Sequence, residues 1–471
     1  MKRFFCVLAA LVLMVSSMTV WTASAAVNDQ FPFKQGDSGE QVTTLLKRLY
    51  TLQYLNTYQI KSGKFTSEAT DAVKKFQRKN GLEETGIVNQ ADWDVLFSDQ
   101  AINAYDIVWN DTNNYKATDK YTLIGDDQFC AGQDGNVILI ILDTYSNSFL
   151  DAVLREDPEY AEGLEDFTYY DNYCSTYMGT YPSMAHLLTG YEYSNEVTIG
   201  QWFHDAWTSD SCQYFFGKLK EYGYDSYFYS VAPVNCGIKS ESMAYFSNQI
   251  ENSTYEGTYV KAKVSENFAT YVQNGVTAVE GKRFIIQHLK GMHDPYKVGT
   301  TGNVKSSAKM EDSMRGWLVI TKAYLEQLKL AGVYDNSTII ITADHGTKNS
   351  GNLQPIFLIK EAGKTGTKLE RTNAPVTHCE LQATILKNIG VPDDELPGKT
   401  IYDFEEDEER ERTFYLNHRN SKYGRLPQYN GRGEGTHNIW LAFTYTGDGS
   451  DLRKQYLRGK SFEVRMNQSF N

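Results

Sequence analysis

The chain has 471 residues, of which 41% are hydrophobic and 22% are charged, a composition typical of globular proteins and unlike that of disordered chains. This length predicts two or three domains, at roughly 150 residues per domain. The formal net charge of −13 argues against a nucleic-acid partner, because the phosphates would repel the protein surface. It also excludes a polybasic attraction to anionic lipid head groups.

The first 26 residues carry the pattern of a secretory signal. Lys2 and Arg3 precede an apolar run over 4–21, and the small residues Ala23-Ser24-Ala25-Ala26 follow it. This pattern predicts a cleaved signal peptide over 1–26 rather than an uncleaved anchor helix. No later stretch has the roughly 18 apolar residues that span a bilayer. We therefore expect a secreted protein with no transmembrane segment after signal cleavage.

Residues 33–98 are predicted to form a small all-α domain of three helices. In the first helix, apolar residues recur at i, i+3, i+4 and i+7, which places them on one face. The other two helices carry apolar residues of their own, and the common core between them would be small. The positions that define the faces are Val42, Leu45, Leu46 and Leu49, then Ala69, Ala72, Val73 and Phe76, then Trp93 and Leu96.

Three segments of this domain, GDSGEQV, LKRLYTLQYL and GKFTSEATDAVKKFQRKNGLEETGIVN, resemble the type-1 peptidoglycan-binding family. The resemblance implies that peptidoglycan is a partner and that the protein is associated with the cell wall. A helical spacer without a ligand is the alternative. The following residues, 99–134, are polar and lack periodicity, and we expect them to form a linker.

Three later segments show apolar runs that end in metal-binding or anion-binding residues. Asp143 follows the run 137–142, and Asp344 and His345 follow the run that ends STIIITA, while His288 lies just beyond Phe284–Ile286. Such runs are typical of strands buried on both faces of a parallel sheet. With helical patterns between them, they predict an α/β domain over 135–404, with a mostly parallel central sheet flanked by helices.

In such sheets the ligand site lies beyond the carboxyl ends of the strands. We therefore expect Asp143, Asp344, His345 and His288 to lie at one rim. Each residue alone could cap a helix or belong to a turn, but together they indicate a site. Carboxylates, an imidazole and a hydroxyl form a hard, mixed oxygen and nitrogen set that suits manganese, zinc or magnesium.

The segment MGTYPSMAHLLTG predicts a short helix, with Thr180 as its N-cap, Pro182 in the first turn and Gly190 as its stop. Thr180 has a second interpretation as a nucleophile. A threonine hydroxyl is not ionised near neutral pH, and a bound metal ion is one way to activate it. A helix N-terminus also favours a phosphate or sulfate group. The two roles are compatible.

The segments NVILIILDTYS, GTYPSMAHLLTG, TADHG and PVTHCELQATIL resemble, in this order, the sulfatase-like branch of the alkaline phosphatase superfamily. The resemblance extends over about 135–403. It implies that Asp143, Thr180, Asp344 and His345 bind the metal ion, with Thr180 as the nucleophile.

A further segment, HLKGMHDPY, is similar to the His-x4-His-x-Pro segment of phosphoethanolamine transferases. This similarity implies that His288 and His293 bind the substrate or donate protons. Lipoteichoic acid synthases share this type of catalytic domain. The resemblance includes both hydrolases and transferases, and the motifs do not separate the two.

The nucleophile segment departs from that of true sulfatases, which carry Cys-x-Pro-Ser-Arg. Thr180 stands at the cysteine position and Met184 at the arginine position. We therefore expect a phosphoryl-ester hydrolase or phosphotransferase that acts through a phosphothreonine on envelope polymers or lipids. The alternatives are a sulfuric ester hydrolase and a catalytically inactive wall-binding protein of the same fold.

The segment Thr377-His378-Cys379-Glu380 has the spacing of a capping box, which predicts a structural role for Glu380. His378 either contacts the substrate and metal ligands or has no role. A charged run begins at 405, and alternating segments after it predict a small antiparallel sheet in a C-terminal subdomain, 405–471. Export would permit a disulfide, and Cys212 with Cys236 is the pair that we expect.

Overall fold

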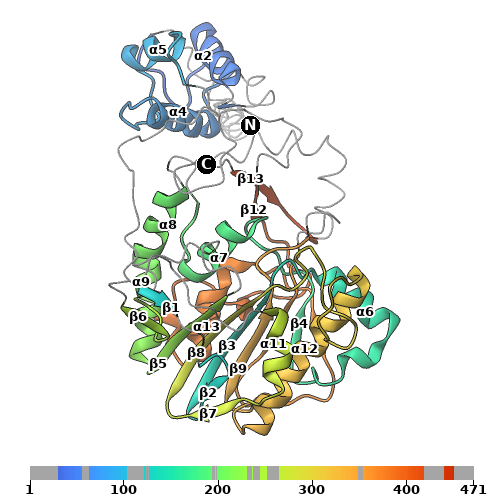
Figure 1. Cartoon of the computed structure of the whole chain (residues 1–471). Coiled ribbons are helices and arrows are strands. Elements are labelled where there is room, and N and C mark those ends of the chain that lie inside the picture. The colour runs from blue at the N-terminus through green and yellow to red at the C-terminus, as the bar shows by residue number, and fades with distance from the viewer. Residues whose placement is uncertain are drawn as a thin grey trace, which may run out of the picture. The chain divides into compact units, whose positions relative to one another are not determined.

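The computed structural model describes residues 30–52, 54–55, 63–102, 121–123, 125, 127–193, 197, 199–230, 236, 244–251, 265–347, 354–417 and 440–449. The predicted signal peptide, 1–26, lies outside the described residues. The chain divides into two compact units, Met1–Asp106 and Ile107–Phe470 (Figure 1).

The first unit is all-α in its described part, as predicted. Its helices are α2 (Glu40–Thr51), α4 (Ser67–Lys79) and α5 (Gln90–Phe97). The Thr66 hydroxyl caps α4 by accepting from the Ala69 N–H at 3.3 Å, and Asn89 and Asp92 form a capping box at the start of α5. The predicted apolar faces meet in one core that also contains Phe33 and Phe65, while Trp93 is only partly buried against it.

The second unit contains a mixed α/β fold with a mostly parallel sheet, as predicted. Within the described residues, seven strands lie in the order β11-β4-β10-β9-β3-β8-β5. Neighbouring strands are parallel except where β10 pairs antiparallel with β9 and β4. The strands are β3 (Gly135–Leu142), β4 (Thr168–Tyr170), β5 (Tyr224–Ser230), β8 (Lys282–Leu289), β9 (Ser337–Thr342), β10 (Phe357–Lys360) and β11 (Glu370–Thr372).

Helices cover both faces of this sheet (Figure 1). Along β3, Ile138, Ile140 and Leu142 belong to a core with residues of α6, α11 and α12. Val137, Leu139 and Ile141 belong to a core on the other face, with residues of α7, α9 and α13. This alternation explains why β3 is apolar at nearly every position. The helices are α6 (Asn147–Glu156), α7 (Thr180–Thr189), α8 (Ile199–Thr208), α9 (Asp210–Glu221), α11 (Ser265–Val272), α12 (Met310–Leu330) and α13 (Leu381–Asn388).

Short strands pair outside the central sheet. Two lie within the predicted linker: β1 (Tyr121–Leu123) pairs with β6 (Gln249–Glu251), and β2 (Cys130–Gly132) pairs with β7 (Thr277–Val279). Near the C-terminus, β12 (Arg412–Asn417) pairs antiparallel with β13 (Trp440–Tyr445). Among the described helices, none is long and apolar enough to cross a bilayer.

The expected disulfide between Cys212 and Cys236 is wrong, because both residues are buried cysteines that no disulfide joins. Both cysteines belong to the same apolar core on one face of the sheet. The Cys236 sulfur also lies 3.6 Å from the His288 Nδ1 atom and 3.9 Å from the Ser230 hydroxyl. The thiol of Cys236 therefore belongs to the surroundings of a candidate site residue.

Candidate metal and nucleophile site

Three parallel strands bring their carboxyl ends to the same rim of the sheet. His288 in β8 pairs with Ile141 in β3, and Ile141 also pairs with Thr342 at the end of β9. Asp143 directly follows β3, and Asp344 lies two residues beyond β9. The equal register of these strands therefore places the two carboxylates and the imidazole side by side.

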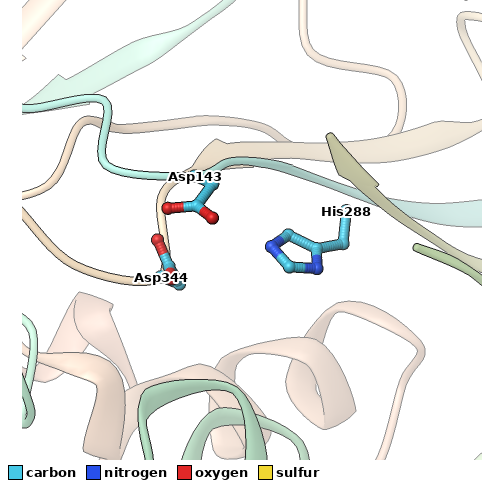
Figure 2. Close-up of side chains that lie close together, drawn as sticks. All are labelled: Asp143, His288 and Asp344. Carbon is cyan, nitrogen blue, oxygen red and sulfur yellow. The ribbon is translucent and has the colours of Figure 1, made fainter. Parts of the chain in front are cut away.

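Asp143, Asp344 and His288 form a compact group of donor atoms. One ligand atom from each residue lies within 4.8 Å of the others, and all three side chains are buried. Figure 2 shows the two carboxylates facing each other, with the imidazole of His288 directed toward them. The resemblance implied that His288 contacts the substrate; the structure places its ring among candidate metal ligands.

Among the described residues, one ring nitrogen of His288 has a hydrogen-bond partner and the other has none. Its Nδ1 atom lies 2.8 Å from the Ser230 hydroxyl, and its buried Nε2 atom has no hydrogen-bond partner among the described residues. Burial lowers the pKa of His288 to about 4, so the ring is neutral near pH 7. A neutral, buried imidazole with an unpartnered nitrogen is suited to hold a metal ion.

Asp344 is charged although it is fully buried. Burial disfavours its charge, but the His345 and His288 imidazoles, the Thr144 N–H and the Thr180 hydroxyl together lower its pKa below the usual value. The N–H groups of Thr144 and His345 donate to Oδ1 at 3.0 and 2.9 Å. Thr144 adopts a φ of 59°, which is unfavourable for a β-branched residue, and this backbone aims its N–H at the carboxylate.

His345 lies between Asp344 and Thr180. Its Nδ1 atom is 2.7 Å from the Gly346 carbonyl, which can only accept, so Nδ1 carries a proton. The Nε2 atom lies 3.5 Å from the Thr180 hydroxyl and 3.4 Å from Asp344 Oδ2. The Nε2 atom of His345 therefore lies near both the nucleophile candidate and the carboxylate.

The prediction that Thr180 is an N-cap is wrong by one residue. Helix α7 begins at Thr180, and its N-cap is Gly179, whose φ of −177° is extended backbone. Gly190 ends the helix with a φ of 69°, as predicted. Among the described residues, the Thr180 hydroxyl makes no capping bond. It contacts His345 and Asp344.

The remaining candidates lie outside this donor group. His293 is exposed, with Nδ1 2.7 Å from the Asp294 carbonyl. His378 is buried, its Nε2 atom lies 3.3 Å from the Ala343 carbonyl, and burial lowers its pKa to about 3. It thus contacts the backbone beside Asp344.

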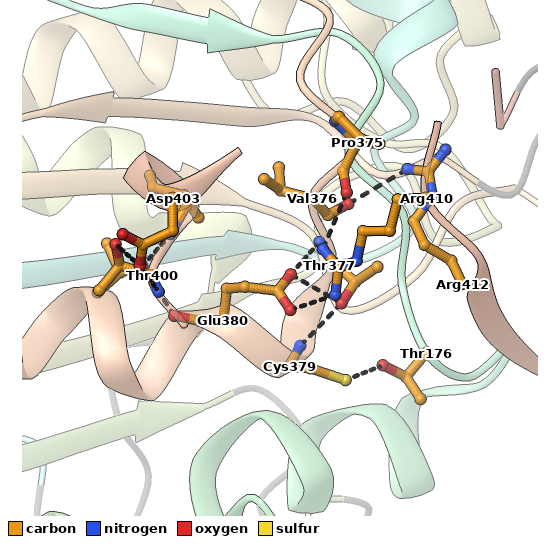
Figure 3. Close-up of polar contacts among 12 residues, drawn as sticks. Thr176, Pro375, Val376, Thr377, Cys379, Glu380, Thr400, Asp403, Arg410 and Arg412 are labelled. Atoms are coloured by element: carbon orange, nitrogen blue, oxygen red, sulfur yellow. Dashed lines mark hydrogen bonds and ion pairs between the residues drawn. The ribbon is translucent and has the colours of Figure 1, made fainter. Parts of the chain in front are cut away.

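The predicted capping box is confirmed. Glu380 accepts hydrogen bonds from both the backbone N–H and the hydroxyl of Thr377, at 2.6 and 3.0 Å (Figure 3). Its other oxygen accepts from Arg410 at 2.7 Å. The carboxylate of Glu380 is therefore occupied by structural bonds.

The described donors fit a divalent cation. Carboxylates and imidazoles with neighbouring hydroxyls match the preferences of manganese, zinc and magnesium. The unpartnered, buried Nε2 atom of His288 is explained if it faces a cation.

The sequence analysis did not predict two residues that support the site. Ser230 contacts His288, and Gly291 lies against the backbone of Asp143. No local pattern marks either residue, because their contacts depend on the pairing of strands distant in sequence.

Comparisons with known proteins give the family. Residues 135–391 match the family model described as Sulfatase, and residues 38–96 match that of the putative peptidoglycan binding domain. A comparison with curated protein sequences finds no match.

Several solved structures are similar to the chain. A Vibrio parahaemolyticus protein of the alkaline phosphatase superfamily is 12% identical, with a TM-score of 0.42, and covers 77% of this chain and 94% of its own. The lipoteichoic acid synthase LtaP from Listeria monocytogenes is 11% identical, with a TM-score of 0.42 and coverages of 75% and 95%. The C-terminal periplasmic domain of EptC from Escherichia coli is 14% identical, with a TM-score of 0.37 and coverages of 70% and 99%.

The Sulfatase model covers more than half of the chain and includes the segments that carry Asp143, Thr180, Asp344 and His345. The chain therefore belongs to the sulfatase family.

Proposed function

We propose that this protein is an exported, wall-associated and metal-dependent phosphoryl-ester hydrolase or phosphotransferase. Thr180 is its nucleophile, and its substrate is a phosphate ester of envelope polymers or lipids. The observation that carries the proposal is the placement of the Thr180 hydroxyl, 3.5 Å from His345 Nε2 at the start of α7, where it makes no capping bond.

The residue at the nucleophile position favours phosphoryl over sulfuryl chemistry. The sulfatase motif places a cysteine where this chain has Thr180, and an arginine where it has Met184. Met184 is buried in the apolar core, so no cation replaces that arginine at this position. A threonine oxygen can form a phosphate ester directly, without modification of the residue.

The metal ion is proposed to be held by Asp143, Asp344, His345 and Thr180. His288 joins this set of ligands, because its ring lies within reach of the two carboxylates. A divalent cation bound there would lower the pKa of the Thr180 hydroxyl and offset the negative charge on phosphoryl oxygens. The pKa of Asp344 lies below its usual value and burial lowers the pKa of His288, so both residues are in the deprotonated forms that bind a cation.

The proposed reaction has two displacements. The Thr180 oxygen forms a bond to phosphorus while the bond to the leaving alcohol breaks. The exposed His293 gives the leaving oxygen a proton, and the proton lost by Thr180 returns to His293 through solvent. Water or an acceptor hydroxyl then forms a bond to phosphorus while the bond from phosphorus to the Thr180 oxygen breaks. The attacking group loses its proton to solvent, and the Thr180 oxygen takes up a proton from solvent, which restores the hydroxyl and releases the phosphorylated product.

The match of 38–96 to a peptidoglycan-binding model supports wall association. A wall-bound enzyme would meet phosphate esters attached to or near peptidoglycan at high local concentration. A secretory signal over 1–26 would deliver the protein to this location.

Assays on chromogenic esters test the proposal. Purified protein, stripped with a chelator and reloaded with Mn²⁺, Zn²⁺ or Mg²⁺, is given bis(p-nitrophenyl) phosphate, p-nitrophenyl phosphate and p-nitrophenyl sulfate. We expect metal-dependent cleavage of a phosphate ester, and an acid-quenched phosphothreonine at Thr180 by peptide mass spectrometry. Cleavage of the sulfate ester alone would establish the sulfuric ester alternative. Bound metal without turnover of any ester or wall polymer would indicate an inactive wall-binding protein.

A further inference from the structure

We infer that Ser230 is a positioning residue, which holds the imidazole of His288 so that its Nε2 atom faces Asp143 and Asp344. This inference rests on the proposed metal centre and deepens it. Ser230 lies at the last position of β5, directly beside His288 in the neighbouring strand β8. The two residues are separated by 58 positions in sequence, yet the Ser230 hydroxyl lies 2.8 Å from His288 Nδ1.

The backbone fixes both partners of this contact. Parallel pairing joins β5 to β8 over seven residues, from Tyr224↔Lys282 to Ser230↔His288. His288 is fully buried and Ser230 is 2% exposed, so water cannot replace the serine hydroxyl easily. The hydrogen bond therefore restricts rotation of the imidazole within a buried site.

The hydrogen bond is compatible with the tautomer of the imidazole that metal binding through Nε2 requires. A histidine that binds a cation through Nε2 must keep the lone pair on that atom and carry its proton on Nδ1. The Ser230 oxygen can accept that Nδ1 proton at 2.8 Å. Cys236, at 3.6 Å from the same nitrogen, offers only a weakly accepting sulfur. Ser230 is thus the stronger partner.

Loss of this hydroxyl should loosen the histidine without removing a ligand. Outer partners of metal-binding histidines typically contribute about 10- to 100-fold to metal affinity. Alanine at 230 leaves the strand and its backbone bonds in place. Threonine at 230 keeps the hydroxyl and is favoured in strands.

The test measures the Mn²⁺ and Zn²⁺ affinity of the full chain by competition with a chromogenic chelator. We expect Ser230→Ala to weaken binding about 10- to 100-fold, and Ser230→Thr to restore most of the affinity. Cys236→Ser, which alters the weaker contact, should change affinity much less. The activity lost by Ser230→Ala should return at saturating metal, because the nucleophile is untouched.

Unchanged metal affinity in Ser230→Ala would overturn the inference. So would wild-type affinity in His288→Ala, which would show that His288 is not a ligand while the metal dependence stands. Absence of metal binding by the wild-type protein would instead overturn the proposed metal centre itself. Histidine ¹⁵N chemical shifts of the metal-loaded protein give an independent readout, with an Nδ1-protonated ring expected for His288.

Discussion

At the scale of single residues, the candidate site contains a hydroxyl group, that of Thr180, which does not cap the helix that it begins. Thr180 occupies the first helical position, where its side chain has no capping bond. Its hydroxyl lies 3.5 Å from His345 Nε2, and the hydroxyl helps to lower the pKa of Asp344. The activity and the stability of the protein should therefore respond differently to changes at position 180.

Thr180→Ala should lower kcat on a chromogenic phosphodiester by about a thousandfold or more, as expected for loss of a nucleophile. Stability should change by less than the cost of a lost cap, about 1 kcal/mol, because the hydroxyl caps nothing and alanine is the better helix former. Thr180→Ser keeps the hydroxyl and should retain part of the activity. Urea unfolding of the three proteins measures stability, and near-normal turnover of the alanine variant would exclude Thr180 as nucleophile.

The two histidines of the HLKGMHDPY segment should differ in their effect on metal binding. His288 is buried among the carboxylates, so His288→Ala should lower both metal affinity and turnover. His293 is exposed and lies outside the donor group, so His293→Ala should lower turnover while the metal affinity stays unchanged. Metal content by atomic spectroscopy and kcat at saturating metal measure the two effects. Metal loss in the His293 variant would show that its proposed role as proton donor is misassigned.

At the scale of elements, the turn after β8 holds the end of β3 in place. The Asp143 N–H donates to the Leu289 carbonyl at 3.0 Å, and the Asp143 carbonyl accepts from Met292 at 2.7 Å. Gly291, with a φ of +51°, lies so close that an added Cβ would be 2.4 Å from the Asp143 carbonyl oxygen. The position of the carboxylate thus depends on a glycine in another strand's turn.

Gly291→Ala should destabilise the protein and weaken metal binding, because the added methyl group must displace the Asp143 backbone. Gly332→Ala is the matched control: Gly332 has a φ of +73° with no atom within 4 Å of its added Cβ. The control should lose only the free energy of unfolding that a residue with a Cβ atom costs at a positive φ, about 1–2 kcal/mol. Urea unfolding and metal titration compare the variants. If the two variants lost equal stability and equal metal affinity, the close approach of Gly291 would not position Asp143.

The sequence predicted the elements whose signals are local. Continuous apolar runs such as that of β3 indicate strands buried on both faces, and residues that follow such runs must lie at one rim. The exact start of α7 was not predictable, since Gly179 and Thr180 can both precede a helix. The Ser230 contact depends on strand register between β5 and β8, which no local pattern encodes. The three-residue strands β1 and β2 are too short to show periodicity.

At the scale of the whole molecule, stability should depend on pH through buried neutral histidines. His186 on α7 is buried, with Nδ1 3.3 Å from the Tyr191 carbonyl and Nε2 3.7 Å from the Cys379 sulfur. Burial lowers its pKa below 6.5, although the Tyr191 carbonyl and the Glu192 and Glu380 carboxylates partly oppose this. Below that pH the unfolded chain therefore binds more protons than the folded protein.

The contribution of His186 to the free energy of unfolding is complete well above pH 6.5 and is lost as the pH falls through and below this value. The loss is at most about 1.4 kcal/mol per pH unit. His186→Asn keeps a donor for the Tyr191 carbonyl but does not titrate, so it should lose less stability than the wild type between pH 7.5 and 5.5. Urea unfolding at the two pH values measures the difference. Identical losses in the two proteins would contradict a neutral, buried His186.

The chain is divided into two compact units, and we expect each to keep its own function when the two are separated. The described part of the first unit has a core of its own, so residues 33–98 should fold and sediment with purified peptidoglycan sacculi. Residues 107–471 should stay in the supernatant and cleave a soluble phosphodiester as fast as the full chain. On a phosphate polymer attached to sacculi, the full chain should be faster, because attachment raises the local concentration of enzyme around its substrate. A free 33–98 fragment added in excess should remove this advantage by occupying the same wall sites. Equal partitioning of the two fragments would contradict the anchoring role and leave the first unit as a spacer.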